Sequence, residues 1–408
     1  MNAPLRLVMI ADDLTGSFDT GVQFEKRGAS VSFTTLENLD GFSAGTDVVV
    51  IDTESRHVPP DAAFQLTARA VRWAVEQGAQ HVYIKTDSGL RGNVGPSIKA
   101  ALQETGCTVA AFAPAYPDMK RVTVHGCQLI DGVPVHESVF GRDPFDPVTS
   151  PTVRGMIEPH GVAVKELESG GDWPQTTADP TTWVIDAETN DDLSLIARRL
   201  SGCAALRVTA GCAAFAAALY PVFGLPDAPR QPQALLSPLL AVCGSVNAIT
   251  RSQVLYGQAI GFRREVIDPF VLTGGAFTSG SFDSLLASIR RGEHLLIDTG
   301  LVSSPECVPL REQIASRLGW LMHRLLVELD GQPCTPMIIG GDTLMGFLRL
   351  LDQPDVHLEG EAAHGVVIFS VMLKGRRVRL LSKSGGFGEE TLLKELCDSM
   401  TAIEGGAY

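Results

Sequence analysis

The stretch IADDLTGSFDTG, residues 10–21, places two adjacent carboxylates, Asp12 and Asp13, directly after a short apolar run. That run, residues 5–10, has the length and composition of a buried strand. Neighbouring like charges cost free energy unless a cation, a metal ion or water offsets them. In parallel α/β sheets, ligands bind at the carboxyl ends of the strands. We therefore predict that Asp12 and Asp13 belong to an active site at the end of the first strand.

Similar apolar runs continue through the first half of the chain and alternate with helical patterns. Residues 61–77 and 94–104 have apolar positions at helical spacing. The strand-like runs after the first are residues 48–51, 82–84, 109–112, 183–186 and 206–209. Alternation of strands and helices predicts a parallel sheet that is covered by helices.

A proline-rich segment separates the two halves of the chain. It contains Pro226, Pro229, Pro232 and Pro238. Because proline interrupts regular structure, we predict a linker at residues 229–238 between domains 1–228 and 239–408. In the second domain we expect strands at residues 239–242, 295–298, 337–339, 366–370 and 378–381, helices from about residue 249 and over residues 311–329, and a loop over residues 272–280. The predicted fold class is α/β, with two domains, each a mainly parallel sheet flanked by helices, and a cleft between them.

Composition limits the classes of partner. The 408 residues carry a formal net charge of −14, which argues against general binding to nucleic acid or to an anionic membrane. No apolar run approaches the roughly 18 residues of a membrane helix, and no signal peptide is recognised. The eight cysteines are scattered and form no CxxC pair, so we expect reduced thiols in a cytoplasmic protein. A homo-oligomer is compatible with the sequence, which does not determine the oligomeric state.

Polar residues follow three strands of the first domain, and in a parallel sheet these strand ends lie along one edge. The candidate side chains are Asp12, Asp13, Arg56, Lys85, Thr86, Asp87, Ser88 and Arg91. Arginine can hold a carboxylate or phosphate through two parallel hydrogen bonds. Carboxylates accept hydrogen bonds from hydroxyl groups, and one can serve as a general base. This mixture fits a polyhydroxylated acid, whereas ordinary surface ion pairs and helix caps are the alternative interpretation.

Three glycine-containing loops follow strands of the second domain. The candidate residues there are Ser245, Gly340, Gly341, Asp342, Thr343, Lys383, Ser384, Gly385 and Gly386. Glycine lets backbone N–H groups approach phosphate oxygens, and a helix N-terminus supplies free donors. The loops match neither GxxxxGK[ST] nor GxGxxG, so the pattern predicts a nucleotide-phosphate site without a known fingerprint. Tight strand–helix turns are the alternative.

Taken together, these motifs resemble the four-carbon acid sugar kinase family, in the family's order and over nearly the whole chain. The matching stretches are Ala11–Gly16, Lys85–Ser88, Leu90–Asn93, Pro114–Pro117, Gly244–Ser245, Gly340–Thr343 and Lys383–Gly388. The sequence differs from the family at Gly89, where threonine is usual, and at Lys120, where glycine is usual.

The resemblance implies a transferase of carbohydrate metabolism that uses ATP and Mg²⁺ to phosphorylate the terminal hydroxyl of threonate, erythronate or an oxo-tetronate. The first domain would bind the sugar acid, with Asp12 or Asp13 orienting the hydroxyl or accepting its proton. Arg56, Lys85 and Arg91 would hold the carboxylate. Ser245 and residues 340–343 would bind the nucleotide, and residues 383–386 would close over its phosphates.

Several points stay open from the sequence. Asp342 is either a helix cap or a residue near Mg²⁺, and the metal ligands are not identified. The particular acid, its stereochemistry and its oxidation state are also undetermined. Two other functions remain as alternatives: a carboxylate-activating enzyme that forms an acyl phosphate, and a non-catalytic sensor that binds sugar acid and nucleotide.

Overall fold

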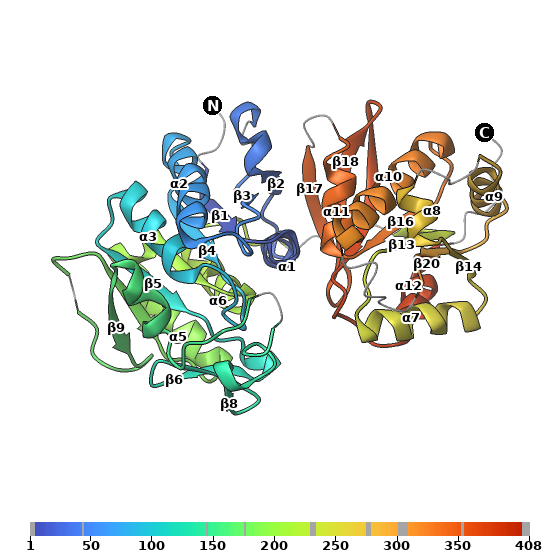
Figure 1. Cartoon of the computed structure of the whole chain (residues 1–408). Helices are drawn as coiled ribbons and strands as arrows, with labels where there is room; N and C mark the ends of the chain where they lie inside the picture. Colours follow the sequence, from blue (N-terminus) through green and yellow to red (C-terminus); the bar gives the residue numbers. More distant parts are fainter. Residues whose placement is uncertain are drawn as a thin grey trace. The chain divides into compact units, whose positions relative to one another are not determined.

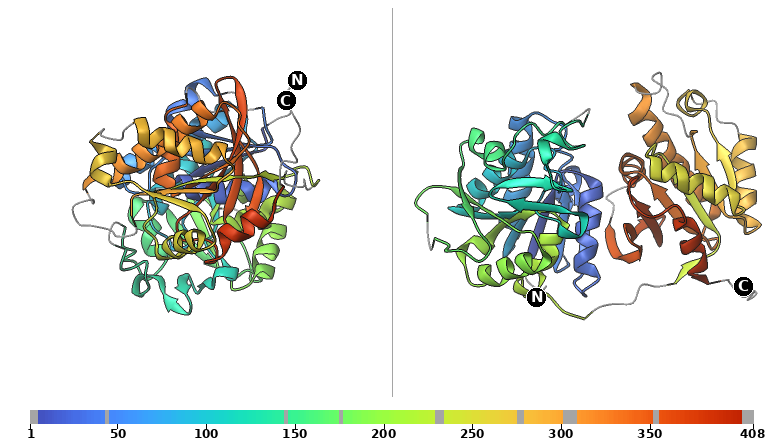
Figure 2. Two further views of the ribbon diagram at one scale, coloured as in Figure 1. Left: turned by 90° about the vertical axis from the view of Figure 1, so that its right-hand side faces the viewer. Right: turned by 90° about the horizontal axis from the view of Figure 1, so that it is seen from below.

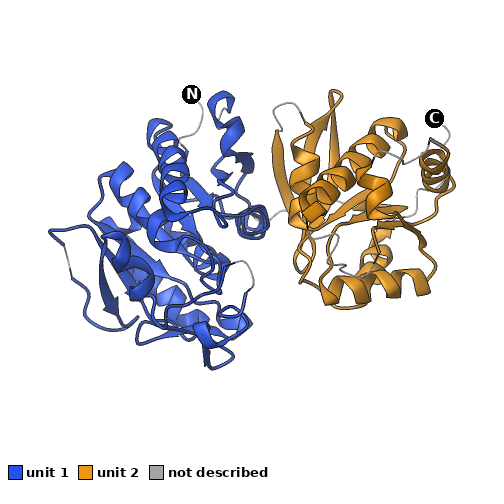
Figure 3. Ribbon diagram, viewed as in Figure 1, with its two compact units in different colours: residues 1–230 blue, residues 231–408 orange. Residues whose placement is uncertain are grey.

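Buried β-branched and aliphatic residues form the strands on which both halves of the chain are built. The computed structural model describes residues 5–42, 45–143, 146–174, 177–228, 234–274, 279–300, 309–351 and 355–401. The chain divides into two units, residues 1–230 and residues 231–408, and each is described by itself (Figure 3).

The first unit contains a parallel sheet. In spatial order its strands are β2 (Val31–Thr35), β3 (Val48–Asp52), β1 (Leu7–Ala11), β4 (His81–Lys85), β11 (Val208–Gly211), β5 (Val109–Ala113), β10 (Thr181–Ile185) and β9 (Ala163–Leu167). Every neighbouring pair in this order is parallel. The predicted strand at residues 206–209 begins later, at Val208, because residues 204–207 form a 3₁₀ turn.

Helices cover both faces of this sheet (Figures 1 and 2). They are α1 (Leu14–Glu25), α2 (Pro60–Glu76), α3 (Val94–Thr105), α4 (Arg154–Ile157), α5 (Asn190–Leu200) and α6 (Ala213–Leu219). Alternate residues of the strands point to opposite faces, so each strand needs apolar residues at successive positions. This requirement explains why the strands appear in the sequence as continuous apolar runs.

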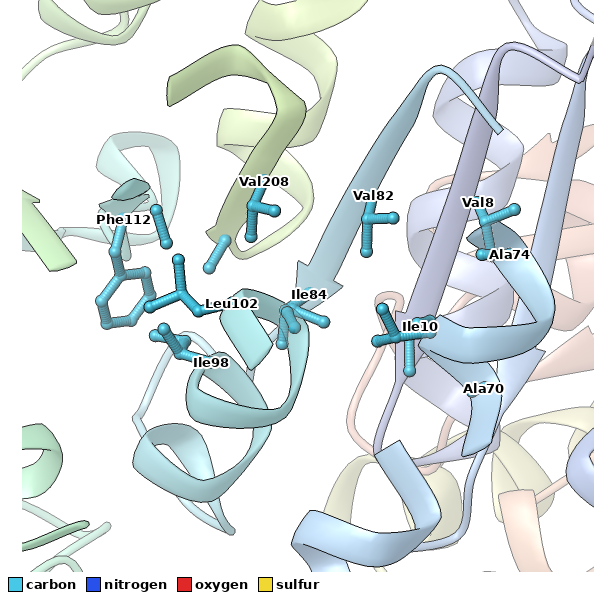
Figure 4. Close-up of a cluster of buried hydrophobic side chains, with 14 of the residues drawn as sticks. Val8, Ile10, Ala70, Ala74, Val82, Ile84, Ile98, Leu102, Phe112 and Val208 are labelled. Atoms are coloured by element: carbon cyan, nitrogen blue, oxygen red, sulfur yellow. The ribbon is translucent and has the colours of Figure 1, made fainter. Parts of the chain in front are cut away.

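One face of the sheet packs on α2 and α3. Figure 4 shows Val8, Ile10, Val82, Ile84 and Val208 of the strands beside Ala70, Ala74, Ile98 and Leu102 of the two helices. On the other face, Phe18 of α1 contacts Phe33, and Phe215 of α6 contacts Tyr83. The sheet is therefore covered on both sides, and its functional residues gather at the strand ends.

A small antiparallel sheet stands beside the parallel one. It consists of β6 (Arg121–Val124), β7 (Cys127–Ile130) and β8 (Val133–Pro134). The two turns are His125–Gly126 and Asp131–Gly132, and all four residues have positive φ. Two central residues with positive φ define the type I′ turn that matches the twist of a hairpin.

The second unit has a mixed sheet. Its strands run in the order β14 (Arg263–Val266), β15 (Leu295–Asp298), β13 (Leu239–Cys243), β16 (Thr335–Ile339), β19 (Arg376–Lys383), β18 (Val366–Leu373) and β17 (Val356–Ala363). The pairs from β14 to β19 are parallel, whereas β18 pairs antiparallel with both β19 and β17. Short connections link these last three strands, which allows only antiparallel pairing.

The helices of this unit are α7 (Ala248–Ala259), α8 (Pro269–Thr273), α9 (Ser279–Arg290), α10 (Arg311–Leu329), α11 (Gly341–Leu348) and α12 (Leu392–Asp398). The loop predicted over residues 272–280 instead contains the end of α8 and the start of α9, and residues 275–278 lie outside the described part of the chain. Within the described ranges, no helix has both the length and the hydropathy needed to cross a bilayer.

The predicted linker differs from the structure at its C-terminal end. Residues 229–233 lie outside the described part of the chain, but Leu235 and Leu236 form a short strand, β12, within the predicted linker. β12 pairs with β20 (Met400–Thr401), and the N–H of Leu236 donates to Thr335 Oγ1 at 2.9 Å. Backbone partners from distant segments thus order residues that the prolines alone suggested were irregular.

Candidate active site

The three polar strand ends of the first unit lie side by side. β1 has β3 on one side and β4 on the other, and Ala11 is in register with both Asp52 and Lys85. The residues that follow these strands, among them Asp12, Arg56 and Ser88, therefore leave the same edge of the sheet.

Arg56 holds both carboxylates of the opening stretch. It donates to Asp12 from Nε at 3.0 Å and from Nη2 at 2.7 Å. It also donates to Asp13 from Nη1 at 2.7 Å and from Nη2 at 2.8 Å. The side chains of Arg56 and Asp12 are only 9% and 11% exposed. Burial raises the pKa of Asp12, and the neighbouring charge of Asp13 adds to that rise while Arg56 opposes it.

Asp13 also begins the helix that follows. Its Oδ1 accepts a hydrogen bond from the N–H of Gly16 at 3.0 Å, which makes it the N-cap of α1. A Cβ at Gly16 would lie 2.5 Å from Asp13 Oδ1 and 2.9 Å from Lys85 Nζ, so this position has no room for a side chain. The negative charges of Asp12 and Asp13 are thus offset by the guanidinium of Arg56 and, at Asp13, also by the N-terminus of α1.

A second group of residues holds the loop that carries Arg56. The side-chain amide of Asn93 donates to the carbonyls of Ser55 at 2.9 Å and Val58 at 3.0 Å. Gly92 has a φ of +85°, and a Cβ there would lie 2.7 Å from Asp12 Oδ2. The Gly92–Asn93 pair therefore lets the loop after β4 pass close to the loop after β3.

Lys85 and Thr86 have polar groups that are not fully hydrogen-bonded within the protein. Lys85 is 6% exposed, and its Nζ donates to the carbonyl of Thr86 at 3.0 Å. Within the described ranges it has no carboxylate partner in an ion pair. Thr86 Oγ1 is buried and has no hydrogen-bond partner in the part of the chain that the structure covers. Unpaired polar groups at a strand end are expected where a polar ligand supplies the missing bonds.

Arg91 is engaged by two carboxylates. It donates to Asp87 from Nε at 2.9 Å and from Nη2 at 3.1 Å, and to Asp143 from Nη1 at 3.1 Å. Burial alone would raise the pKa of Asp87, but the hydrogen bond from Arg91 and the charge of Arg56 outweigh it and hold that pKa well below its usual range. Like Arg56, Arg91 is paired within the protein.

The hairpin of β6 and β7 contributes residues that sequence reasoning did not select. The Arg121 side chain donates from Nη1 to the Ser88 hydroxyl, and Gln128 Nε2 donates to the Ser88 carbonyl at 3.1 Å. The Phe140 ring lies 4.9 Å from the Arg121 guanidinium and 5.2 Å from that of Arg91. The Asp-Gly dipeptide at residues 131–132, which forms the next turn between β7 and β8, is a strong hairpin signal and could have revealed this antiparallel sheet.

Phe140 also gives a physical reason for Gly89. A Cβ at residue 89 would lie 2.5 Å from the Phe140 ring, so the threonine that is usual in the family does not fit beside this ring. The Phe140 ring occupies the space that a side chain at residue 89 would need.

In the second unit, the three glycine-containing loops follow β13, β16 and β19, which are neighbours in the sheet. The loops contact each other closely. A Cβ at Gly385 would lie 2.2 Å from Ser245 Oγ, and one at Gly244 would lie 2.0 Å from Thr343 Oγ1. Gly340 has a φ of +116°, a conformation that favours glycine, and it is the N-cap of α11. By contrast, a Cβ at Gly386 would meet only Asn247 Nδ2, at 3.7 Å.

Lys383 is buried beneath the last of these loops. Only 1% of it is exposed, and its ammonium donates to the carbonyls of Ser384 at 2.8 Å and Phe387 at 3.0 Å. It also lies 3.4 Å from the carbonyl of Gly385 and 3.4 Å from Thr250 Oγ1. Burial lowers the pKa of Lys383 to about 8. Its ammonium group therefore holds three carbonyls of the loop of residues 384–387 together through hydrogen bonds.

Asp342 lies in the first turn of α11 and forms an ion pair there. Its 57% exposed carboxylate pairs with Arg311 at 2.9 Å rather than with a backbone N–H at the helix start. Across the described ranges, no group of three or more His, Cys, Asp or Glu side chains is arranged to hold a metal ion. Mg²⁺ usually binds through one or two carboxylates together with substrate phosphates, so a single exposed carboxylate fits a phosphate-borne ion.

Comparisons with known proteins agree with this organisation. Residues 7–219 match the family model described as the sugar-binding N-terminal domain. The D-threonate kinase of Salmonella typhimurium is 29% identical, over 98% of this chain and 99% of that kinase. The D-erythronate kinase of Heliobacterium modesticaldum is 32% identical, over 61% of this chain and 59% of that kinase.

A solved structure from Haemophilus influenzae, described by the family model DUF1537, has the same fold. It superposes with a TM-score of 0.73 at 18% identity and covers 97% of this chain and 100% of its own. The family model spans more than half of the chain, and the named relatives extend the similarity over nearly all of it. The chain therefore belongs to the four-carbon acid sugar kinase family.

Proposed function

We propose that this protein transfers the γ-phosphoryl group of ATP to the terminal hydroxyl of a four-carbon sugar acid. The observation that carries the proposal is the carboxylate pair Asp12 and Asp13, held by the buried Arg56 at the end of β1, inside the span that matches the sugar-binding family model. The names of the relatives, which are D-threonate and D-erythronate kinases, support the class of substrate.

Asp13 is the better candidate for contact with the hydroxyl. Both oxygens of each carboxylate accept hydrogen bonds from Arg56, but the side chain of Asp13 is 27% exposed whereas that of Asp12 is only 11% exposed. A carboxylate at this position orients the hydroxyl and accepts its proton as the new bond to phosphorus forms. Phosphoryl transfer depends mainly on such positioning and on neutralisation of charge. Arg56 holds the Asp13 carboxylate in place through two hydrogen bonds.

The nucleotide site is assigned to the loops after β13, β16 and β19. The helices α7 and α11 begin at these loops, and their first N–H groups are donors suited to phosphate oxygens. Ser245 and Thr343 supply hydroxyl groups beside them. Mg²⁺, carried by the phosphates, would have Asp342 as its protein ligand and would neutralise charge on the transferred group.

The direct test is a turnover screen with the full-length protein and MgATP. We expect ADP release only with certain members of a panel of threonates, erythronates and their 2-oxo and 3-oxo forms, with a phosphate ester as the product by ³¹P NMR. Asp13→Asn should lower kcat by roughly 10²–10⁴-fold, the usual contribution of a general base, while calorimetric affinity for ADP stays unchanged.

Three other outcomes of this screen would point to a different function or refute the substrate. An acyl phosphate trapped by hydroxylamine would instead establish carboxylate activation. Calorimetric binding of acid and ATP without turnover would establish a sensor. Absence of both turnover and binding over the whole panel would refute the sugar acid substrate.

A further inference from the structure

We propose that Arg121, at the start of β6, binds the carboxylate of the acid substrate. This inference deepens the proposed function and rests on it, because it identifies which of the guanidinium groups around the loop after β4 remains available for an anion. The arginines there are Arg56, Arg91 and Arg121; Lys85, at the same strand end, can add a point charge but cannot bind both oxygens of a carboxylate as a guanidinium does.

Two of the arginines are largely used by the protein itself. A guanidinium has five N–H donors. Arg56 uses four donor contacts on Asp12 and Asp13, and Arg91 uses three on Asp87 and Asp143. With its carboxylates ionised, each cluster of one arginine and two aspartates has a net charge of −1. Neither cluster by itself therefore offers net positive charge to an incoming carboxylate.

Arg121 differs from these two arginines because it has no carboxylate partner among the described residues. Its side chain donates to one neutral acceptor, the Ser88 hydroxyl, and it forms no ion pair with any described residue. Its remaining N–H groups have no acceptor within the described ranges. A guanidinium with free donors and no counter-ion can bind both oxygens of a carboxylate.

The surroundings of Arg121 are well hydrogen-bonded and adjoin the candidate site. Its backbone exchanges two hydrogen bonds with Tyr116, at 2.7 and 3.1 Å. Gln128 connects the same hairpin to the Ser88 carbonyl and is fully buried, as is its partner Thr123 at 2.7 Å. The Phe140 ring, 4.9 Å from the guanidinium, restricts the side chain further. A charge fixed in this way loses little entropy on binding a ligand.

The test compares variants of the full-length enzyme on the acid that gives turnover. Arg121→Ala should lower kcat/KM by about a hundredfold, mainly through KM, because a desolvated carboxylate would lose its charged partner. Arg121→Gln, which retains a donor for Ser88, should lose nearly as much. Added guanidinium ion should partly restore the activity of Arg121→Ala, a rescue that a merely structural role would not give.

Arg142 provides the matched control. It lies in the segment next to Phe140, and among the described residues its side chain donates only to the carbonyls of Ser138 and Glu137. Arg142→Ala should leave kcat/KM unchanged, and melting curves will show whether each variant is folded.

The failure of this inference can be separated from the failure of the proposed function. If the wild type phosphorylates an acid and folded Arg121→Gln keeps its KM, the carboxylate is held elsewhere and the inference is wrong while the function stands. If no acid is turned over but calorimetry shows acid binding that Arg121→Gln abolishes, the inference stands without the kinase activity. If no acid of the panel binds, both are refuted.

Discussion

At the scale of single residues, the sequence predicted which polar side chains lie together at the strand ends better than it predicted their pairing. Asp12, Asp13 and Arg56 were expected together because they follow neighbouring strands, and they lie together. Their interactions depend on distances that only the folded chain defines. Arg56, expected to hold the substrate, is mostly occupied by the two acids, so we now regard it as a positioning residue.

Arg56 should therefore be important for stability. We expect Arg56→Met to lower the free energy of unfolding by about 3–5 kcal/mol, because removing one partner of a buried ion pair leaves uncompensated charge. Urea denaturation at pH 7 measures the change. Arg69→Ala is the control, since its pair with Asp40 is 45% and 86% exposed and should contribute at most about 1 kcal/mol. Equal losses for the two variants would contradict a special role for the cluster.

Lys383 predicts a dependence of stability on pH. Burial lowers its pKa in the folded protein to about 8, from an ordinary value of 10.5. Between these values the unfolded chain binds more protons than the folded one, so deprotonation favours the folded state and this contribution to stability rises with pH. We expect the unfolding free energy of the wild type, relative to Lys383→Met, to increase from pH 8 to pH 10.5. If the difference in unfolding free energy between the wild type and Lys383→Met stays constant over this pH range, folding does not lower the pKa of Lys383 and the prediction is wrong.

At the scale of elements, the strands with continuous apolar runs were predictable, including β18 and β19. The strands β2, β9 and β14 of the parallel sheets and the hairpin of β6 and β7 were not predicted. Strands covered on both faces need continuous apolar runs, such as residues 48–51, and these are visible in any sequence. β6 and β7 are half-exposed and short, and their signal lies in the turn residues at 125–126 and 131–132. α1 was also not predicted, because its polar and glycine-rich first turn resembles a loop until Asp13 is known to cap it.

The turn before β6 explains one difference from the family. Lys120 has a φ of +51°, in the left-handed region that glycine adopts without strain. The glycine usual at this position in the family therefore has a conformational reason. The lysine side chain itself is 80% exposed and pairs with Asp131 at 3.9 Å, so it adds no steric conflict to this backbone conformation.

The close packing of the glycine loops leads to a prediction about nucleotide binding. Gly385→Ala should weaken ADP binding at least tenfold without unfolding the protein, because its Cβ would lie 2.2 Å from Ser245 Oγ and must displace one of the loops. Gly280→Ala in α9 is the matched control, since a Cβ there meets nothing within 4 Å. Isothermal calorimetry with ADP measures both. Equal affinities would mean that the nucleotide does not use the loops after β13 and β19.

At the scale of the whole molecule, each unit has its own hydrophobic core. Val8, Val82 and Phe112 belong to the core of the first unit, whereas Ala241, Met337 and Leu381 belong to that of the second. The sequence indicated two domains through its length and its prolines. It did not show that backbone pairing resumes within the proline-rich segment, because β12 is ordered by β20, more than 150 residues later.

Separate cores predict separate unfolding. We expect two calorimetric transitions, which Val8→Ala and Leu381→Ala will assign by lowering one each. ADP at a hundredfold excess over its Kd should stabilise only the unit of residues 231–408, by about 2.7 kcal/mol. The acid substrate should stabilise only the unit of residues 1–230. A shift of the first unit's transition by ADP alone would contradict the division of ligands between the units.

The buried ammonium of Lys383 has a consequence for the loop that covers it. Three carbonyls and one hydroxyl surround it, which is an oxygen environment of the kind that dehydrated potassium occupies elsewhere. Here the cation is covalently attached, so it is present once in every molecule and cannot be exchanged. The carbonyls of Ser384, Gly385 and Phe387 consequently have a cationic donor that belongs to the chain itself.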